Sequence, residues 1–116
     1  MAFRFEDLKV WHLAVDLANE VDLLTKGFPM DDRFSLATQI KRAADSVVLN
    51  IAEGSTGQTK PEFKRFLSIA LRSAIEVVAC LHLAHKRKYI DDQTYRKHYN
   101  QYEVLCKMIT KLRESL

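Results

Sequence analysis

Apolar residues recur at helical spacing in four segments of the chain, and no segment shows the alternation typical of a strand. The first segment covers residues 5–26, and Gly27, in the left-handed conformation, and Pro29 are expected to end it. The second covers about residues 31–53, with Asp31 or Asp32 as its capping residue. The predicted inward stripes are Leu8, Trp11, Val15, Ala18 and Val21 in the first helix and Leu36, Ile40, Ala44, Val47 and Ile51 in the second.

The connection after the second helix, GSTGQTK, has the glycines and lysine of a phosphate-binding loop but not its spacing. Such a loop follows a strand and separates its glycines by about four residues, and neither condition holds here. Gly54 is instead expected to be the C-terminal cap of the second helix. Thr59 and Glu62 match a reciprocal capping box at the start of the third. The stretch therefore predicts a corner between two helices.

The third helix is predicted to run to about Lys88, and the fourth from about Asp91 to the end of the chain. The third has an inward stripe of Phe63, Leu67, Ala70, Ala74, Val77, Leu81 and Ala84, and the fourth one of Tyr95, Tyr99, Tyr102, Cys106, Ile109, Leu112 and Leu116. Four amphipathic helices with short connections predict one all-α domain over residues 1–116. The expected architecture is an antiparallel up-down-up-down four-helix bundle.

Further apolar residues lie outside these stripes. They are Val10, Leu13, Leu17 and Leu24 in the first helix and Phe66, Ile69, Leu71, Ile75, Val78 and Leu83 in the third. Soluble monomers rarely expose contiguous apolar patches of such size. This excess predicts that the bundle assembles as a homo-oligomer.

Composition agrees with one compact domain. Of the 116 residues, 47% are hydrophobic and 28% charged, with three glycines and two prolines, which disfavours a disordered or loop-rich chain. No signal-peptide pattern and no apolar run of about 18 residues occurs, so we expect a cytoplasmic protein that does not engage a membrane. Cys80 and Cys106 occupy apolar helical positions and are expected to be free thiols.

The net charge of +3 is unevenly distributed. Residues 1–53 carry six Lys or Arg and nine Asp or Glu, a net of −3, whereas residues 54–116 carry twelve and six, a net of +6. Either an electropositive face that meets phosphates or a lysine-rich solvated helix explains this split. The candidate nucleic-acid-binding residues are Lys60, Lys64 and Arg65 near one end of the bundle and Lys86, Arg87, Lys88, Arg96 and Lys97 near the other.

Catalytic and metal-binding patterns are not found. No Glu is followed three positions later by His, as di-iron bundles require, and no serine has a histidine within helical reach. His82 and His85 lie one turn apart but precede three cations, without a carboxylate in that turn, and are interpreted as favourable charges at a helix C-terminus. We therefore predict a protein without enzymatic activity, metal, cofactor or small-molecule substrate.

A polar line on the second helix consists of Arg42, Ser46, Asn50 and Glu53. Glu53 is unusual because a carboxylate in the last turn opposes the helix dipole. The line is either a solvated face or a polar network in which Glu53 meets Arg65 or Arg72. Such a pair forms within one chain or across a subunit boundary.

Three stretches, FEDLKVW, RAADSVVLNIAEGS and EFKRFLSIALRSAIE, carry a family resemblance over about residues 3–115. They resemble the small bacterial four-helix bundle family encoded in intervening sequences of large-subunit ribosomal RNA genes, which has been labelled a ribosomal protein family. That family is similar to the accessory variability determinant of diversity-generating retroelements. The matching positions are Trp11, Arg42, Ala43, Ser46, Asn50, Ile51, Ala52, Glu53, Gly54, Phe63, Phe66, Leu67 and Glu76.

The resemblance implies a left-handed bundle that forms a ring-like homo-oligomer, with a pentamer expected. It also implies a basic ring that contacts nucleic acid, with a reverse transcriptase or a ribosomal component as a partner. Val48 replaces a family proline and Arg72 a family glycine, which puts the family's helix kink and a close backbone approach in question.

Two functions follow as hypotheses. The first is a non-enzymatic oligomer that binds RNA or DNA, with RNA expected, through phosphates rather than bases. The alternative is a protein-interaction scaffold or accessory subunit without direct nucleic-acid contact.

Overall fold

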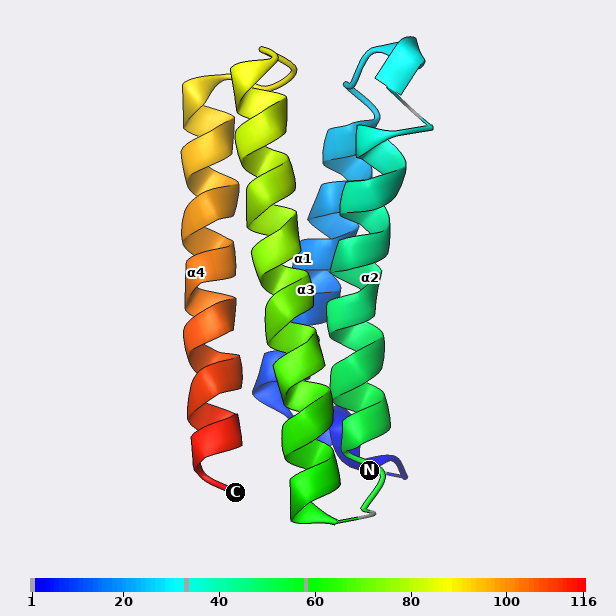
Figure 1. The fold of residues 1–116 in the computed structure, drawn as a ribbon, viewed down its shortest axis with the longest axis vertical. Coiled ribbons are helices and arrows are strands. Elements are labelled where there is room, and N and C mark those ends of the chain that lie inside the picture. The colour runs from blue at the N-terminus through cyan, green and yellow to red at the C-terminus, as the bar shows by residue number, and fades with distance from the viewer. Residues whose placement is uncertain (1, 33, 58) are drawn as a thin grey trace.

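The structure, a computed structural model, describes residues 2–32, 34–57 and 59–116, which form four α-helices and no strand. The elements are the 3-10 helix η1 (Arg4–Asp7), α1 (Lys9–Thr25), the 3-10 helix η2 (Met30–Asp32), α2 (Leu36–Gly54), α3 (Lys60–Lys86) and α4 (Asp92–Glu114). Successive helices run in opposite directions along a rod of 43 × 22 × 22 Å (Figure 1). The all-helical, four-helix prediction is confirmed.

The cores of α2 and α3 follow the predicted stripes. Every residue predicted to face inward on these two helices is buried. The helical period identifies the inner face of α2, whereas α3 also carries apolar residues outside its buried stripe. These two helices pack extensively against each other, and α3 also packs against α4.

The inner faces of α1 and α4 were predicted correctly only in part: Val21, Tyr102 and Ile109 are buried as expected, but most of the other buried positions differ. The buried residues are Val10, Ala14, Leu17, Val21 and Thr25 in α1 and His98, Tyr102, Leu105 and Ile109 in α4. Apolar residues surround most of α1, so two different stripes fit the helical period equally well. Trp11, which was predicted to face inward, is half-buried beside Phe5, with ring centroids 4.6 Å apart. In α4, Tyr95 and Tyr99 are half-buried, and the Tyr95 hydroxyl lies near the His82 ring nitrogens.

The first helix end differs from its prediction. Gly27 does not adopt the expected left-handed conformation. In the described chain the glycine with a positive φ is Gly57, with a φ of 87°. Ser35 is the N-cap residue of α2, and the carboxylate of Asp32 accepts a hydrogen bond from its hydroxyl at 2.6 Å instead of capping the helix. The turn between α1 and α2 is therefore built differently from the predicted caps.

Gly54 also has a different role from the one predicted. It is the last residue of α2, it is buried, and its φ is not positive. A Cβ atom at this position would lie 2.6 Å from Cβ of Phe66 and 3.0 Å from Cδ1 of Phe63. The glycine is therefore required by the close approach of α2 to α3, not by a left-handed cap.

The start of α3 bears out half of the predicted capping box. The Thr59 hydroxyl accepts a hydrogen bond from the Glu62 amide at 3.1 Å. The Glu62 carboxylate does not return to the Thr59 amide but pairs with Arg65 at 2.8 Å. That hydrogen bond from Arg65 holds the pKa of Glu62 below its usual value.

Most of the predicted apolar excess is covered within one chain. Val10 and Leu17 are buried, and most of the others are half-buried against the core, leaving Ile75 and Leu83 exposed by 55% and 44%. Other large apolar side chains are exposed instead: Phe3, Leu23, Met30, Phe34, Leu49 and Val104. The exposed apolar surface is thus spread over several helices and turns.

α3 is long and apolar enough to cross a membrane by length and composition alone. A mostly buried core helix of a soluble protein meets the same criteria; 33% of the apolar window of α3 is buried here, and eight of its residues lie in the core. Cys80 of α3 and Cys106 of α4 are free thiols, and burial raises the pKa of Cys80 to about 11.

His98 predicts a pH dependence of stability. It is 5% exposed, and its Nδ1 atom has no hydrogen-bond partner in the described chain. Burial lowers the pKa of His98 below its usual value of 6.5, although Glu20 opposes this shift. The unfolded chain therefore binds a proton that the folded chain resists, so stability is full above about pH 6.5 and falls as the pH is lowered. We expect the melting temperature to fall between about pH 7.5 and pH 5.5.

Thermal unfolding of His98→Gln should show a smaller fall over the same range, because the titrating group is removed. His12→Gln is the matched control, since His12 is exposed. An equal fall in all three proteins would contradict this role of His98.

Candidate nucleic-acid interface

The corner between α3 and α4 presents a run of cations. Arg87 caps α3, and the amide of Lys88 donates to the carbonyl of His85 at 3.0 Å. Lys88 has a φ of 63°, a left-handed conformation that favours glycine. Asp91 begins the next helix by accepting a hydrogen bond from the Thr94 amide at 2.7 Å. The tight corner brings the end of α3 and the start of α4 to the same end of the rod (Figure 1).

We call the predicted cations at this corner the α3–α4 patch. They are Lys86, Arg87, Lys88, Arg96 and Lys97, and all five are exposed. Three of them are paired with carboxylates: Arg87 with Asp32 at 3.4 Å, Arg96 with Asp92 at 3.0 Å and Lys97 with Glu20 at 3.4 Å. Lys86 and Lys88 have no ion pair within the described part of the chain. The patch is therefore less cationic than its sequence suggests.

The α2–α3 patch, Lys60, Lys64 and Arg65, lies at the opposite end of the rod, where α3 begins (Figure 1). Lys60 and Lys64 are exposed, whereas Arg65 is held by Glu62 and lies over the ring of Phe66, 4.8 Å from its centroid. Arg4 of η1 joins this end, 5.3 Å from the centroid of the Phe63 ring. Sequence reasoning missed Arg4, which precedes every predicted helix.

Hydrogen bonds connect only part of the polar line of α2. Ser46 and Ser73 share a hydrogen bond of 2.8 Å between their hydroxyls, and the Asn50 amide donates to the Ser46 carbonyl at 2.8 Å and to its hydroxyl at 3.0 Å. Ser73 was missed, because only the packing of α2 on α3 shows that it faces Ser46. Ser46 and Ser73 line a groove of about 490 Å³.

The predicted ion pair of Glu53 does not form within the chain. Glu53, Arg42 and Arg72 are exposed, and Arg65 takes Glu62 as its partner. Glu62 is three residues away on the same helix, so the local pair forms in place of the one between helices. A pair across a subunit boundary remains a prediction.

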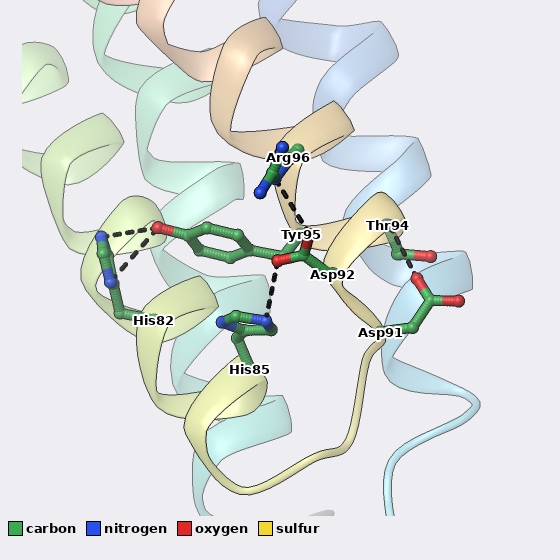
Figure 2. A network of polar contacts seen from close by, with 7 residues as sticks. All are labelled: His82, His85, Asp91, Asp92, Thr94, Tyr95 and Arg96. Atoms are coloured by element: carbon green, nitrogen blue, oxygen red, sulfur yellow. Dashed lines mark hydrogen bonds and ion pairs between the residues drawn. The ribbon is translucent and has the colours of Figure 1, made fainter.

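Histidine and tyrosine rings from two helices meet beside the α3–α4 patch (Figure 2). The Tyr95 hydroxyl lies 2.9 Å from Nε2 of His82, and Nε2 of His85 lies 3.4 Å from Oδ1 of Asp92. A carboxylate therefore reaches His85 from α4, although none lies in its own turn, as the sequence indicated. No group of three or more His, Cys, Asp or Glu side chains in the described residues could hold a metal ion.

Comparison with known proteins identifies the family. Residues 6–111 match the family described as 23S rRNA-intervening sequence protein. The chain belongs to this family. The resemblance drawn from the sequence to the intervening-sequence proteins is confirmed, while the similarity to retroelement accessory proteins stays a prediction.

A solved structure has the same fold as this 23S rRNA-intervening sequence protein. It is the crystal structure of a protein of unknown function from the S23 ribosomal protein family of Bacteroides thetaiotaomicron VPI-5482. The two chains are 24% identical and superpose with a TM-score of 0.83 over 90% of this chain and 95% of the other. A search of curated proteins gave no match.

Proposed function

We propose that the protein is a non-enzymatic, cytoplasmic homo-oligomer that binds RNA through the phosphate backbone. The α3–α4 patch carries this proposal, because it gathers exposed cations from two helices at one end of the rod. Lys86 and Lys88 are the cations there with no carboxylate partner in the described chain, so they can meet a phosphate without breaking an ion pair. The family's tie to intervening sequences of 23S rRNA favours RNA as the nucleic acid.

Assembly would strengthen this weak surface. Two or three free cations per end bind a polyanion poorly, but several copies that face one RNA act together. Leu23, Leu49, Ile75 and Val104 are each more than half exposed, but each comes from a different helix, and single apolar residues of this kind are normal at a surface. The expectation of assembly therefore rests on the family resemblance. The resemblance makes a pentamer the expected assembly.

One observation favours the alternative, a protein-interaction scaffold. Arg87 and Lys97 are paired with carboxylates from distant parts of the chain, Asp32 and Glu20, so their charges are already matched within the bundle. Cations used in this way have a structural role and need no nucleic acid.

Sedimentation velocity tests assembly and RNA binding in one experiment. We expect the protein to sediment as a multiple of its 13.4 kDa chain and to carry a fluorescent structured RNA with it at about 50 mM salt. An assembled protein that leaves the RNA behind would support the scaffold. A monomer that carries the RNA would refute assembly alone, and a monomer with free RNA would refute the whole proposal.

A further inference from the structure

Four aromatic rings form a continuous surface array at the α3–α4 corner. We call His82, His85, Tyr95 and Tyr99 the corner cluster. The rings of His85 and Tyr95 are stacked, with centroids 4.4 Å apart and planes 11° from parallel. His82 meets Tyr95 edge-on at 5.1 Å and Tyr99 at 6.2 Å, and the two tyrosines are 5.8 Å apart. Figure 2 shows Tyr95 between the two histidines, with its hydroxyl toward His82 and its ring face over His85.

The corner cluster does not belong to the bundle core. His82 is exposed, Tyr95 and Tyr99 are half-buried, and the side chain of His85 is 37% exposed. Tyr95 borders the buried stripe of α4, which begins at His98, and is packed against the core. Four adjacent rings at the surface leave apolar area in water, which a bound aromatic group would cover.

Polar contacts at the ring edges hold the cluster in place, while the stacking of Tyr95 on His85 covers one face of each of these two rings. The Tyr95 hydroxyl is within hydrogen-bond distance of both His82 nitrogens, at 2.9 and 3.2 Å. Asp92 contacts His85 on one side and Arg96 on the other, at 3.4 and 3.0 Å. Because these contacts fix the rings before a ligand arrives, binding would lose little side-chain entropy.

In the sequence, residues of the cluster adjoin the cations of the α3–α4 patch. His85 directly precedes Lys86, and Tyr95 directly precedes Arg96 and Lys97. Proteins that bind single-stranded nucleic acid combine these two elements, since cations follow the backbone while bases stack on aromatic side chains. In a duplex the base faces are stacked on one another, so a duplex would contact the cations of the patch and not the aromatic rings. An acidic peptide would likewise use the cations but offers few rings to stack.

We propose that the corner cluster stacks the unpaired bases of single-stranded RNA, so that the α3–α4 patch prefers single strands to duplexes. This inference rests on the proposed RNA binding and specifies its ligand. Stacking is tolerant of sequence, so the preference would concern strandedness rather than base identity.

Fluorescence anisotropy with a labelled RNA of about 12 nucleotides, alone and annealed to its complement, tests the inference. The variant is Tyr95→Leu, which removes the ring, and the matched control is Tyr95→Phe, which keeps the ring and loses the hydroxyl. We expect Tyr95→Leu to weaken single-strand binding by about 10-fold and to leave duplex binding within about 2-fold. Tyr95→Phe should bind both RNAs nearly as the unmodified protein does.

An equal loss for both RNAs, or no loss for either, would overturn the stacking inference and leave the proposed function standing. Failure of the unmodified protein to bind either RNA would overturn both. Should Tyr95→Leu lose its helical circular dichroism, His82→Ala replaces it with the same expected results, because His82 is exposed and its removal leaves the core intact.

Discussion

Gly54→Ala is expected to destabilise the protein by about 2 kcal/mol and to lower its melting temperature by about 8 °C. The new Cβ would lie 2.6 Å from Cβ of Phe66, an atom fixed to the α3 backbone that cannot rotate away. α2 and α3 would have to separate, and these two helices contribute sixteen buried residues to the core. Overpacking of this kind costs up to about 3 kcal/mol, and the better helix propensity of alanine returns about 1 kcal/mol.

The matched control for this substitution is Gly27→Ala. Gly27 also lies at the end of a helix, but a Cβ there would meet only the Leu24 carbonyl oxygen at an ordinary 3.6 Å, and its φ is not positive. We expect this variant to be neutral or slightly stabilised, because alanine reduces the freedom of the unfolded chain. Thermal unfolding of both variants decides the matter. If Gly54→Ala melted with the unmodified protein, the close approach of α2 and α3 would not be what requires this glycine.

The second large effect is expected from the cations that lack a partner. Lys86→Gln combined with Lys88→Gly should weaken RNA binding by about 30-fold, because two phosphate contacts are lost in each subunit of an assembly. Glycine suits position 88 in particular, since the backbone there has a φ of 63° and the substitution relieves strain while it removes the charge. The folded state should therefore be preserved, which thermal unfolding can check.

Two other pairs of substitutions test whether a loss of RNA affinity comes from lost local phosphate contacts or only from the lower net charge of the protein. Lys60→Gln with Lys64→Gln removes the same two charges at the opposite end of α3, and Lys107→Gln with Lys111→Gln removes them from exposed positions of α4 outside both patches. We expect the control pair on α4 to lose at most about 3-fold, through the general field of the protein. Equal losses for all three pairs would mean that charge acts only at long range and that neither patch is a binding site.

The inner face of α2 could be predicted because it carries one apolar stripe, and the predicted stripe of α3 is buried although further apolar residues lie outside it. α1 could not, since Trp11 and Leu17 lie on competing stripes of equal quality and only the neighbouring helices select one. In α4 the tyrosine spacing was misleading. Tyr102 is buried, while Tyr95 places its hydroxyl against His82 at the surface, and a helical period does not distinguish the two environments.

The candidate cations could be located from the sequence, but the sequence did not show which of them are already paired with carboxylates. The pairs Glu62 with Arg65 and Asp92 with Arg96 were visible in principle, because their members lie three and four residues apart on one helix. The pairs of Arg87 with Asp32 and Lys97 with Glu20 were not, since they join distant segments that only the fold brings together. For the same reason the stacking of His85 on Tyr95, which joins α3 to α4, was not foreseen.

The dependence of RNA affinity on salt tests most directly whether this protein binds nucleic acid through its phosphates. Anisotropy titrations of a labelled single-stranded RNA between about 50 and 300 mM salt give the slope of log affinity against log salt concentration. We predict a slope of about −3 or steeper, corresponding to at least four neutralised phosphates at about 0.7 per contact, and a shallower slope for the variant with Lys86→Gln and Lys88→Gly. A slope near zero, or no binding at the lowest salt concentration, would contradict backbone-directed RNA binding.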